Sequence, residues 1–271
     1  MSNKHLNKAK KLKNDEFYTQ ISDIEKELPY YKEQFENKIV YCNCDSEFSN
    51  FWLYFKENFN NLKLKKLIIT HKNGNYKIEL TKKGIVKSKL SQNGDFRSPD
   101  CIALLNKADI VCTNPPFSLL IEYVDLLVKY NKKFLIIFPF LSCLNRNIFN
   151  LMKNDKIWLG NNYPNTFSTP DLTTKAKVLT AWLTNIKKAN KMNFTKKYYS
   201  YCNYDNYNNA INIDNIKDIP NNYNGLIGVP ITFFKYYDKE KYEIIEILDR
   251  PVIGNKTLFT RLIVKKRGVK S

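Results

Sequence analysis

Residues 108–130 read ADIVCTNPPFSLLIEYVDLLVKY, and this stretch decides the fold. It opens with an apolar run typical of a buried strand, and from Leu119 to Tyr130 it has the apolar spacing of an amphipathic helix. TNPPF (Thr113–Phe117) stands between the two. Adjacent prolines fix two φ angles near about −65°, and a residue before proline avoids helical geometry. The stretch therefore predicts a strand, a stiff loop that presents an amide and an aromatic ring, and a helix.

Strand-like and helix-like segments alternate along the first two thirds of the chain. This alternation predicts an α/β fold with a mostly parallel sheet. Phe51, Trp52 and Phe55 belong to an aromatic segment with helical spacing, Phe48–Phe59, and are expected in the core. Strands are expected at Lys38–Cys42, Leu64–Thr70, Asp109–Cys112, Lys133–Pro139, Ile157–Gly160 and Val178–Asn185, a helix at Asn147–Met152, and a turn at Asn73-Gly74 with the segments Tyr76–Leu80 and Gly84–Lys87 around it.

The sequence pattern changes after about Lys188. The stretch YYSYCNYDNYNNAINIDN (198–215) has little periodicity, and two apolar runs follow at Gly225–Phe234 and Thr257–Val264. A length of 271 residues fits one large domain, or one domain with a smaller appendage. We place the boundary near 187–195, which divides the chain into residues 1–187 and 188–271.

The chain is strongly basic, with 44 Lys and Arg against 26 Asp and Glu, a formal net charge of +18. Such an excess favours a polyanionic partner, most often a nucleic acid, although a general bias toward Lys and Asn is the alternative. There is no run of 18 apolar residues to span a membrane. The N-terminus lacks the apolar core of a signal peptide, so we expect a cytoplasmic protein.

Cysteines and histidines argue against metal chemistry. Cysteines stand at 42, 44, 101, 112, 143 and 202 without a C-x-x-C pair, which predicts buried free thiols in a reducing compartment. The only histidines are His5 and His71. No ligands stand at zinc spacing, and a histidine-based catalytic triad has little support.

Polar segments follow several of the expected strands. Asn43-Cys44-Asp45 ends the first strand, Gly94-Asp95-Phe96 lies in a polar turn, and TNPPF ends the third strand. Ligands of open parallel sheets bind beyond the carboxyl ends of the strands. The three segments are therefore expected to line one cleft.

These segments carry a resemblance. Asn-Pro-Pro-Phe at a strand end is the signature of S-adenosyl-L-methionine-dependent amino methyltransferases, and the chain resembles the adenine-specific DNA methyltransferases of the EcoRI methylase type from about residue 13 to 265. The resemblance implies a Rossmann-like class I methyltransferase sheet, seven-stranded and mostly parallel, with a C-terminal DNA-recognition portion. It is carried by KNDEFYTQISDIEKEL (13–28), IVYCNCDSEFSNFWLYF (39–55), GDFRSP (94–99) and VCTNPPFSLLIEYV (111–124).

The resemblance also implies a reaction, the transfer of a methyl group from S-adenosyl-L-methionine to N6 of adenine in a specific double-stranded DNA site. The Asn114 side-chain oxygen and the Pro115 carbonyl would accept hydrogen bonds from the target amine, and Pro116 completes the rigid loop. Phe117 would stack on the target base after extrusion from the duplex. No metal and no general base are required.

By the same resemblance, the cofactor occupies the cleft. Phe17, Tyr18 and Thr19 contact its methionine end, and Asn43, Asp45 and Asn114 border it. Asp95 accepts a hydrogen bond from the cofactor adenine, with Phe96 against the ring. The chain departs from common methyltransferases in two ways, since NCDSEFSNF has no glycine and the second strand ends at Thr70-His71 without an acid. The group that holds the ribose stays open, with Glu47 as one possibility.

For DNA, the resemblance places target recognition in residues 188–271, and we add the loop near Asn161–Asp171, where Tyr163 is a candidate second contact to the base. The basic ends, Lys4–Lys13 and Lys265–Lys270, are either phosphate contacts or tails. A cognate restriction endonuclease is the expected partner and a nucleoid-associated location follows, although a solitary enzyme is possible. The alternatives are methylation of RNA adenine or of a protein glutamine, and a DNA-binding homologue without activity.

Overall fold

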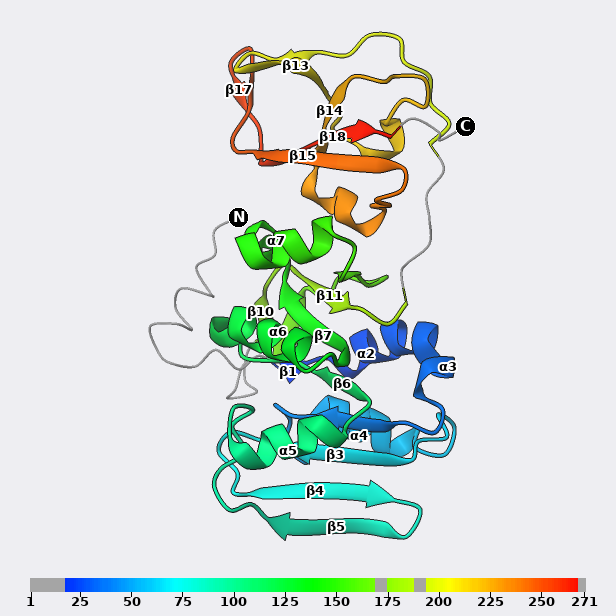
Figure 1. Ribbon diagram of the computed structural model, residues 1–271, viewed down its shortest axis with the longest axis vertical. Coiled ribbons are helices and arrows are strands. Elements are labelled where there is room, and N and C mark those ends of the chain that lie inside the picture. The colour runs from blue at the N-terminus through cyan, green and yellow to red at the C-terminus, as the bar shows by residue number, and fades with distance from the viewer. Residues whose placement is uncertain (1–17, 169–174, 188–193, 268–271) are drawn as a thin grey trace. The chain divides into compact units, whose positions relative to one another are not determined.

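The computed structural model describes residues 18–168, 175–187 and 194–267 (Figure 1). The chain forms two compact units. The first comprises residues 1–147 and 159–188, and the second comprises residues 148–158 and 189–271. Phe17 and the basic segment Lys4–Lys13 lie outside the described residues.

The first unit has an α/β fold built on a mixed β-sheet whose central strands are parallel. β3, β2, β6 and β7 are parallel neighbours, and β4, β5 and β11 pair antiparallel at their flanks. In spatial order the strands are β5 (Gly84–Lys89), β4 (Tyr76–Thr81), β3 (Lys66–Thr70), β2 (Ile39–Cys42), β6 (Ile110–Thr113), β7 (Lys133–Pro139), β11 (Thr180–Thr184) and β8 (Trp158–Leu159).

This sheet has eight strands among the described residues, where seven were expected. Two of the eight strands, β4 and β5, form an antiparallel hairpin at one edge of the sheet. Only residues 71–75 separate β3 from β4, and a parallel strand would need a crossover of about a dozen residues. The predicted turn at Asn73-Gly74 is confirmed, because the Gly74 N–H donates to the His71 carbonyl at 2.8 Å.

The central strands of the sheet are buried along almost their whole length, which is why they appear in the sequence as continuous apolar runs. In β7 only the first and last residues escape full burial, as expected of a parallel strand covered on both faces. β7 has the predicted bounds, and β2, β3, β6 and β11 lie within about two residues of theirs.

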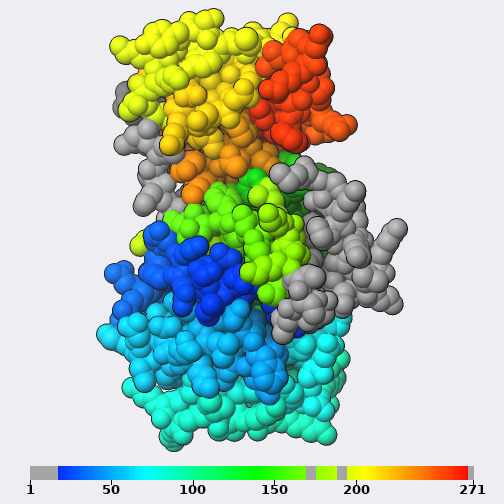
Figure 2. Space-filling model, turned by 180° about the vertical axis from the view of Figure 1, so that it is seen from behind, coloured from blue at the N-terminus to red at the C-terminus, as the bar shows by residue number. Residues whose placement is uncertain are grey.

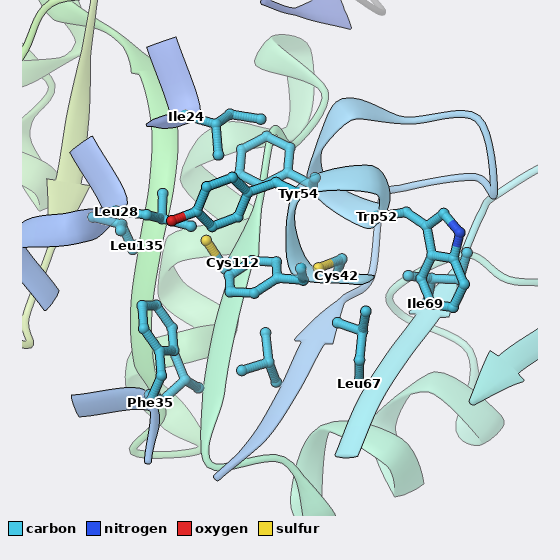
Figure 3. Packing of buried hydrophobic residues seen from close by; sticks show 14 of the residues in the cluster. Ile24, Leu28, Phe35, Cys42, Trp52, Tyr54, Leu67, Ile69, Cys112 and Leu135 are labelled. Carbon is cyan, nitrogen blue, oxygen red and sulfur yellow. The ribbon is translucent and has the colours of Figure 1, made fainter. Parts of the chain in front are cut away.

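One face of the sheet packs on N-terminal helices. Ser49 caps α4 by accepting from the Trp52 N–H at 3.1 Å, and Phe51, Trp52 and Phe55 are buried as expected. Figure 3 shows residues of these helices meeting Cys42 and Cys112 of the central strands. The covering elements, blue in Figure 2, are α2 (Ile21–Glu27), a 3-10 turn (Leu28–Tyr31), α3 (Lys32–Phe35) and α4 (Asn50–Glu57).

The other face carries α5 (Pro99–Lys107) and α6 (Leu120–Lys129). α6 buries Leu120, Tyr123, Val124 and Leu127, which are spaced three or four residues apart as in any amphipathic helix. The helix predicted over 119–130 is thereby confirmed.

A small sheet fastens the N-terminal segment to the rest of the unit. β1 (Tyr18–Thr19) pairs antiparallel with β9 (Thr166–Ser168), which also pairs with β10 (Lys175–Lys177). The Asn50 amide donates to the Thr19 carbonyl at 2.7 Å. β1 is therefore attached both to β9 and to the start of α4.

The second unit contains a five-stranded sheet. β13 and β14 are parallel, whereas β18 pairs antiparallel with β14 and β15. Two of the strands fall in the stretch 198–215, where the sequence showed little periodicity. The elements are α7 (Arg146–Lys153), whose residues from Ile148 belong to this unit, β12 (Asn203–Tyr204), β13 (Tyr207–Asn212), β14 (Leu226–Pro230), β15 (Tyr242–Leu248), β18 (Arg261–Lys266) and the hairpin β16 (Val252–Ile253) with β17 (Lys256–Thr257).

The cysteines are free thiols, and four of them are buried. The expectation of six buried thiols is wrong for Cys202, which is exposed, and Cys44 is half-buried. No helix in the described ranges is long and apolar enough to cross a membrane.

Glu27, the last residue of α2, is a fully buried carboxylate. Its oxygens accept from the Tyr31 hydroxyl at 2.8 Å and from the backbone N–H groups of Asn161 at 2.8 Å and Asn162 at 2.9 Å. The side-chain amides of both asparagines also donate to it. A Cβ on Gly160 would lie 2.3 Å from Glu27 Oε1, so only glycine fits beside the carboxylate. The loop that precedes β9 is thus bound to α2.

We predict that Glu27→Gln lowers the free energy of unfolding by about 2–4 kcal/mol. The substitution places an NH₂ group against donors that now face a carboxylate oxygen. Urea unfolding followed by tryptophan fluorescence measures the change. Glu33→Gln, at an exposed glutamate of α3, is the matched control and should stay within about 0.5 kcal/mol of the parent. Equal stability of the two variants would contradict the structural role of Glu27.

Candidate active site

The loop after β6 holds the residues singled out from the sequence. Thr113 is fully buried at the strand end, Pro115 is buried, and Asn114 and Pro116 are half-buried. The Pro116 carbonyl accepts from the Leu119 N–H at 3.0 Å, which starts a 3-10 turn over Phe117–Leu119 that leads into α6. The Asn114 side-chain oxygen is shielded from solvent. The prolines therefore fix the loop between a buried strand and a helix that is buried on one face.

A pocket opens where this loop meets the ends of β2 and β3. It encloses about 740 Å³ of space, part of which is open solvent. As predicted, the three strand-end segments line one cleft. The lining residues proposed from the sequence are Tyr18, Thr19, Asn43, Asp45, Asp95, Phe96, Asn114, Pro115 and Pro116, and Cys44, Ser46, Ser49, Asn50, Phe51, His71, Lys72, Gly94 and Leu119 complete the wall.

Phe117 does not belong to this wall. Its half-buried ring packs edge-on against Phe167 of β9, with ring centroids 6.4 Å apart. Glu47 also lies apart from the pocket lining, and its carboxylate pairs with Lys87 at 3.0 Å. His71 and Lys72 stand at the end of β3, so no acid follows that strand.

Asp45 is the buried carboxylate of the pocket. The Thr113 hydroxyl donates to Asp45 Oδ2 at 2.5 Å, and the Asp45 N–H donates to the Thr70 carbonyl at 3.1 Å. Burial raises the pKa of Asp45 to about 6, although hydrogen bonds from Thr113 and Ser49 and the nearby His71 act in the opposite direction. Asp45 thus joins the ends of β2, β3 and β6.

Asn43 and Thr19 bring buried polar atoms into the pocket wall. The Tyr123 hydroxyl donates to Asn43 Oδ1, and the Tyr123 ring packs edge-on against Phe96 with centroids 4.9 Å apart. Asn43 Nδ2 and Thr19 Oγ1 are buried without a hydrogen-bond partner within the described part of the chain. Buried polar groups are nearly always satisfied, so this wall is suited to a ligand with both donors and acceptors.

Asp95 is held by Arg97. The guanidinium donates to both carboxylate oxygens at 2.8 Å and lies over the Phe96 ring, 5.2 Å from its centroid. The hydrogen bonds from Arg97 hold the pKa of Asp95 below its usual value. Asp95 therefore stays ionised, and a ligand that donates to it shares the oxygens with Arg97.

Gly94 explains how the Asp95 turn reaches the end of β3. A Cβ at this position would lie 2.2 Å from the His71 carbonyl oxygen. The Gly94 N–H donates to the Gly74 carbonyl at 2.7 Å. Only glycine allows the two turns to pack backbone to backbone, which sets Asp95 and Phe96 at the pocket.

Comparison with known proteins agrees with this geometry. The profile of the family described as "Adenine-specific methyltransferase EcoRI" matches residues 5–83 and 69–270. The chain belongs to this family. The resemblance drawn from the sequence motifs is thereby confirmed.

Three curated relatives of this EcoRI methylase family member align over nearly its full length. Type II methyltransferase M.EcoRI of Escherichia coli is 42% identical, with 98% of each chain covered. Type II methyltransferase M.MgeORF184P of Mycoplasma genitalium is 38% identical over 96% of this chain and 92% of its own. Type II methyltransferase M.MpnI of Mycoplasma pneumoniae is 34% identical over 96% and 91%. No solved structure matches significantly.

A methyltransferase of this family implies a cofactor of the S-adenosyl-L-methionine type. The lining of the pocket suits such a molecule, since it combines two carboxylates, the aromatic rings of Tyr18, Phe51 and Phe96, and the buried polar atoms of Asn43 and Thr19. Among the described residues there is no group of His, Cys, Asp or Glu side chains that would hold a metal ion.

Sequence reasoning missed several residues that organise the site. Tyr123 and Thr113 orient Asn43 and Asp45, and Arg97 binds Asp95. Arg97 follows Asp95 by two residues and was detectable as a nearby charge. Tyr123 is fully buried on α6, where its spacing signals only an apolar helix face.

We predict that ionisation of Asp45 lowers the free energy of unfolding as the pH rises through about 6. Between the unfolded pKa near about 4 and the folded pKa, the folded state binds more protons, so the free energy of unfolding falls across this window by up to about 3 kcal/mol. Asp45→Asn removes this contribution, so the variant should gain stability over the parent when the pH is raised from about 4.5 to about 7.

Urea unfolding at the two pH values measures the effect. Asp125→Asn, at an exposed carboxylate of α6, is the control for loss of a surface charge. A difference between Asp45→Asn and the parent that is the same at both pH values would show that Asp45 does not titrate as described.

Proposed function

We propose that this protein is a site-specific DNA adenine N6-methyltransferase that uses S-adenosyl-L-methionine, and that it is the modification enzyme of a restriction-modification system. Membership of the EcoRI methylase family supports the reaction, and the relatives named as Type II methyltransferases support the biological setting. The observation that carries the proposal is that Asn114, Pro115 and Pro116 line the same pocket as Asn43, Asp45 and Asp95.

The chemistry required of the loop is electrostatic. An exocyclic adenine amine is a poor nucleophile, because its lone pair is delocalised into the ring. Oxygen acceptors around the N–H groups draw the nitrogen toward tetrahedral geometry and stabilise the positive charge that grows in the transition state. We assign these roles to the Asn114 side-chain oxygen and the Pro115 carbonyl. Both belong to a loop that Pro116 and the buried Thr113 keep rigid.

Phe117 is proposed to stack on the extruded base. Stacking of a base on an aromatic side chain contributes roughly 1–3 kcal/mol. The ring is half-buried against Phe167, and that packing supports a fixed orientation. Tyr163 is retained as a second candidate, because Glu27 holds the backbone of the loop immediately before it.

The cofactor is proposed to occupy the pocket described above. When bound, it supplies an activated methyl group on a positively charged sulfur. Tyr18 and Thr19 bind its methionine end, together with Phe17 by resemblance, and Asn43, Asp45 and Asn114 border it. Asp95 and Phe96 bind the adenine. We leave the ribose unassigned, since Glu47 is engaged with Lys87.

We further propose that the second unit, with residues 188–271, contributes target recognition and that a cognate restriction endonuclease acts on the same DNA site. A cytoplasmic, nucleoid-associated location follows from that role. RNA adenine or a protein glutamine would present a similar planar amine. Incubation with a radiolabelled methyl donor and DNA, RNA or protein separates these substrates, and a thermal shift with the cofactor separates an enzyme from an inactive DNA-binding homologue.

We predict that Asn114→Ala reduces the methylation rate by about 10²–10³-fold, because one acceptor for the target amine is lost. DNA affinity and cofactor affinity should stay near those of the parent. Transfer of tritiated methyl groups to DNA from cells lacking the enzyme measures the rate. Asn106→Ala, at an exposed asparagine of α5, is the control. Full activity of Asn114→Ala would remove the role given to its amide.

We predict that Asp95→Ala weakens binding of the demethylated cofactor, S-adenosylhomocysteine, by about 10–100-fold, since a hydrogen bond to a carboxylate contributes about 1.5–3 kcal/mol. Isothermal titration calorimetry measures the affinity. Arg97→Ala is the matched variant, because it removes the partner of Asp95 but leaves the carboxylate that is proposed to bind the cofactor. Unchanged affinity in Asp95→Ala, or an equal loss in both variants, would argue against a direct contact from Asp95.

A further inference from the structure

An open groove lies on the second unit, and none of its lining residues lines the catalytic pocket. It lies between the end of α7, the turn that leads into β15, and the paired ends of β15 and β18. The lining residues are Lys153, Asn154, Tyr237, Lys239, Glu240, Lys241, Tyr242, Glu243, Ile244, Lys265, Lys266 and Arg267.

The positive charge of this unit is concentrated in the groove. Six cationic and two acidic side chains line it. Elsewhere, the described part of the unit carries eight cationic and seven acidic side chains, which nearly cancel. Lys239, Lys241, Lys265 and Arg267 are exposed and form no ion pair with any described residue. Their charges are therefore available to a polyanion.

The groove is a fixed surface. Its buried floor includes Tyr237 and Tyr242, and the Tyr237 hydroxyl donates to the Lys153 carbonyl at 3.0 Å. The Lys266 ammonium donates to the Pro220 carbonyl at 2.7 Å, and the Arg267 N–H donates to the Lys241 carbonyl at 2.8 Å. The backbones that carry the exposed cations are thus held in place.

We propose that this groove, which we call the basic groove, binds the sugar-phosphate backbone of the DNA substrate. The inference rests on the proposed function and assigns it a second contact surface. Lysines bind phosphates as point charges, and phosphate contacts contribute affinity and orientation without sequence preference. The basic groove accordingly strengthens binding to any duplex and leaves the choice of site to other residues.

A second lysine patch provides a matched control. Lys65, Lys82 and Lys83 are exposed around a depression of the first unit. Lys82 and Lys83 turn the hairpin from β4 to β5 beside the start of β3, whereas the catalytic pocket lies at the end of β3. This patch also presents exposed lysines, but it lies near the start of β3, whereas the pocket lies at the other end of that strand.

The test compares Lys239→Gln/Lys241→Gln/Arg267→Gln with Lys65→Gln/Lys82→Gln/Lys83→Gln. Each triple variant removes three exposed cations. Fluorescence anisotropy with a short labelled DNA duplex is measured from about 50 to 200 mM salt, where each lost phosphate contact reduces the slope of log affinity against log salt by about 0.9. Thermal unfolding and calorimetry with S-adenosylhomocysteine verify that both variants are folded.

We expect the groove variant to lower the slope by about 2–3 and to bind the duplex at least about 10-fold more weakly than the control variant at low salt. Equal affinities and slopes for the two variants would overturn the inference, as would a groove variant that loses binding to an RNA duplex but keeps binding to DNA. Failure of the unmodified protein to methylate any DNA would instead refute the proposed function. The two failures are therefore distinguishable.

Discussion

The hydrogen bond from the Thr113 hydroxyl to the Asp45 carboxylate joins the ends of two neighbouring parallel strands, and the rest of the site depends on it. Parallel strands that end at the same edge leave polar groups side by side, and these groups need partners once they are buried. Thr113 and Asp45 satisfy each other, and the Asp45 N–H extends the link to β3. The loop that begins at Asn114 therefore starts from a fixed position, and the prolines carry this rigidity to α6.

The N-terminal segment is the second element on which the pocket depends. Tyr18 and Thr19 line the pocket, yet they precede all the strands of the central sheet. They are held by pairing with β9 and by Asn50, while Glu27 binds the loop that leads to β9. The buried Glu27 carboxylate forms no ion pair with any described residue and is stabilised by five donors. Two residues of the pocket wall are thus held by a strand about 150 positions further along the chain.

The residues of the catalytic pocket and the cations of the basic groove lie in different parts of the sequence. The pocket residues lie between 18 and 119, and the unpaired cations of the basic groove lie between 239 and 267. A net charge of +18 indicates a polyanion without saying where it binds. The described charges of the second unit nearly cancel except at the groove, which locates a surface that composition alone does not reveal.

Taken alone, the sequence determined the parallel core strands, the helix after TNPPF and most of the pocket wall, because buried parallel strands are continuous apolar runs and strand ends share one edge. It did not reveal the strands within 198–215 or the exposure of Cys202, and the family resemblance implied seven strands where the sheet has eight among the described residues. The partners of the pocket side chains were decided only by tertiary structure. In the sequence, Tyr123 indicates only an apolar position of a helix, and Arg97 indicates only a surface charge. In the folded chain, Tyr123 donates to Asn43 and Arg97 donates to Asp95. Local patterns encode periodicity and turn chemistry, whereas a contact between distant side chains exists only after the chain has packed.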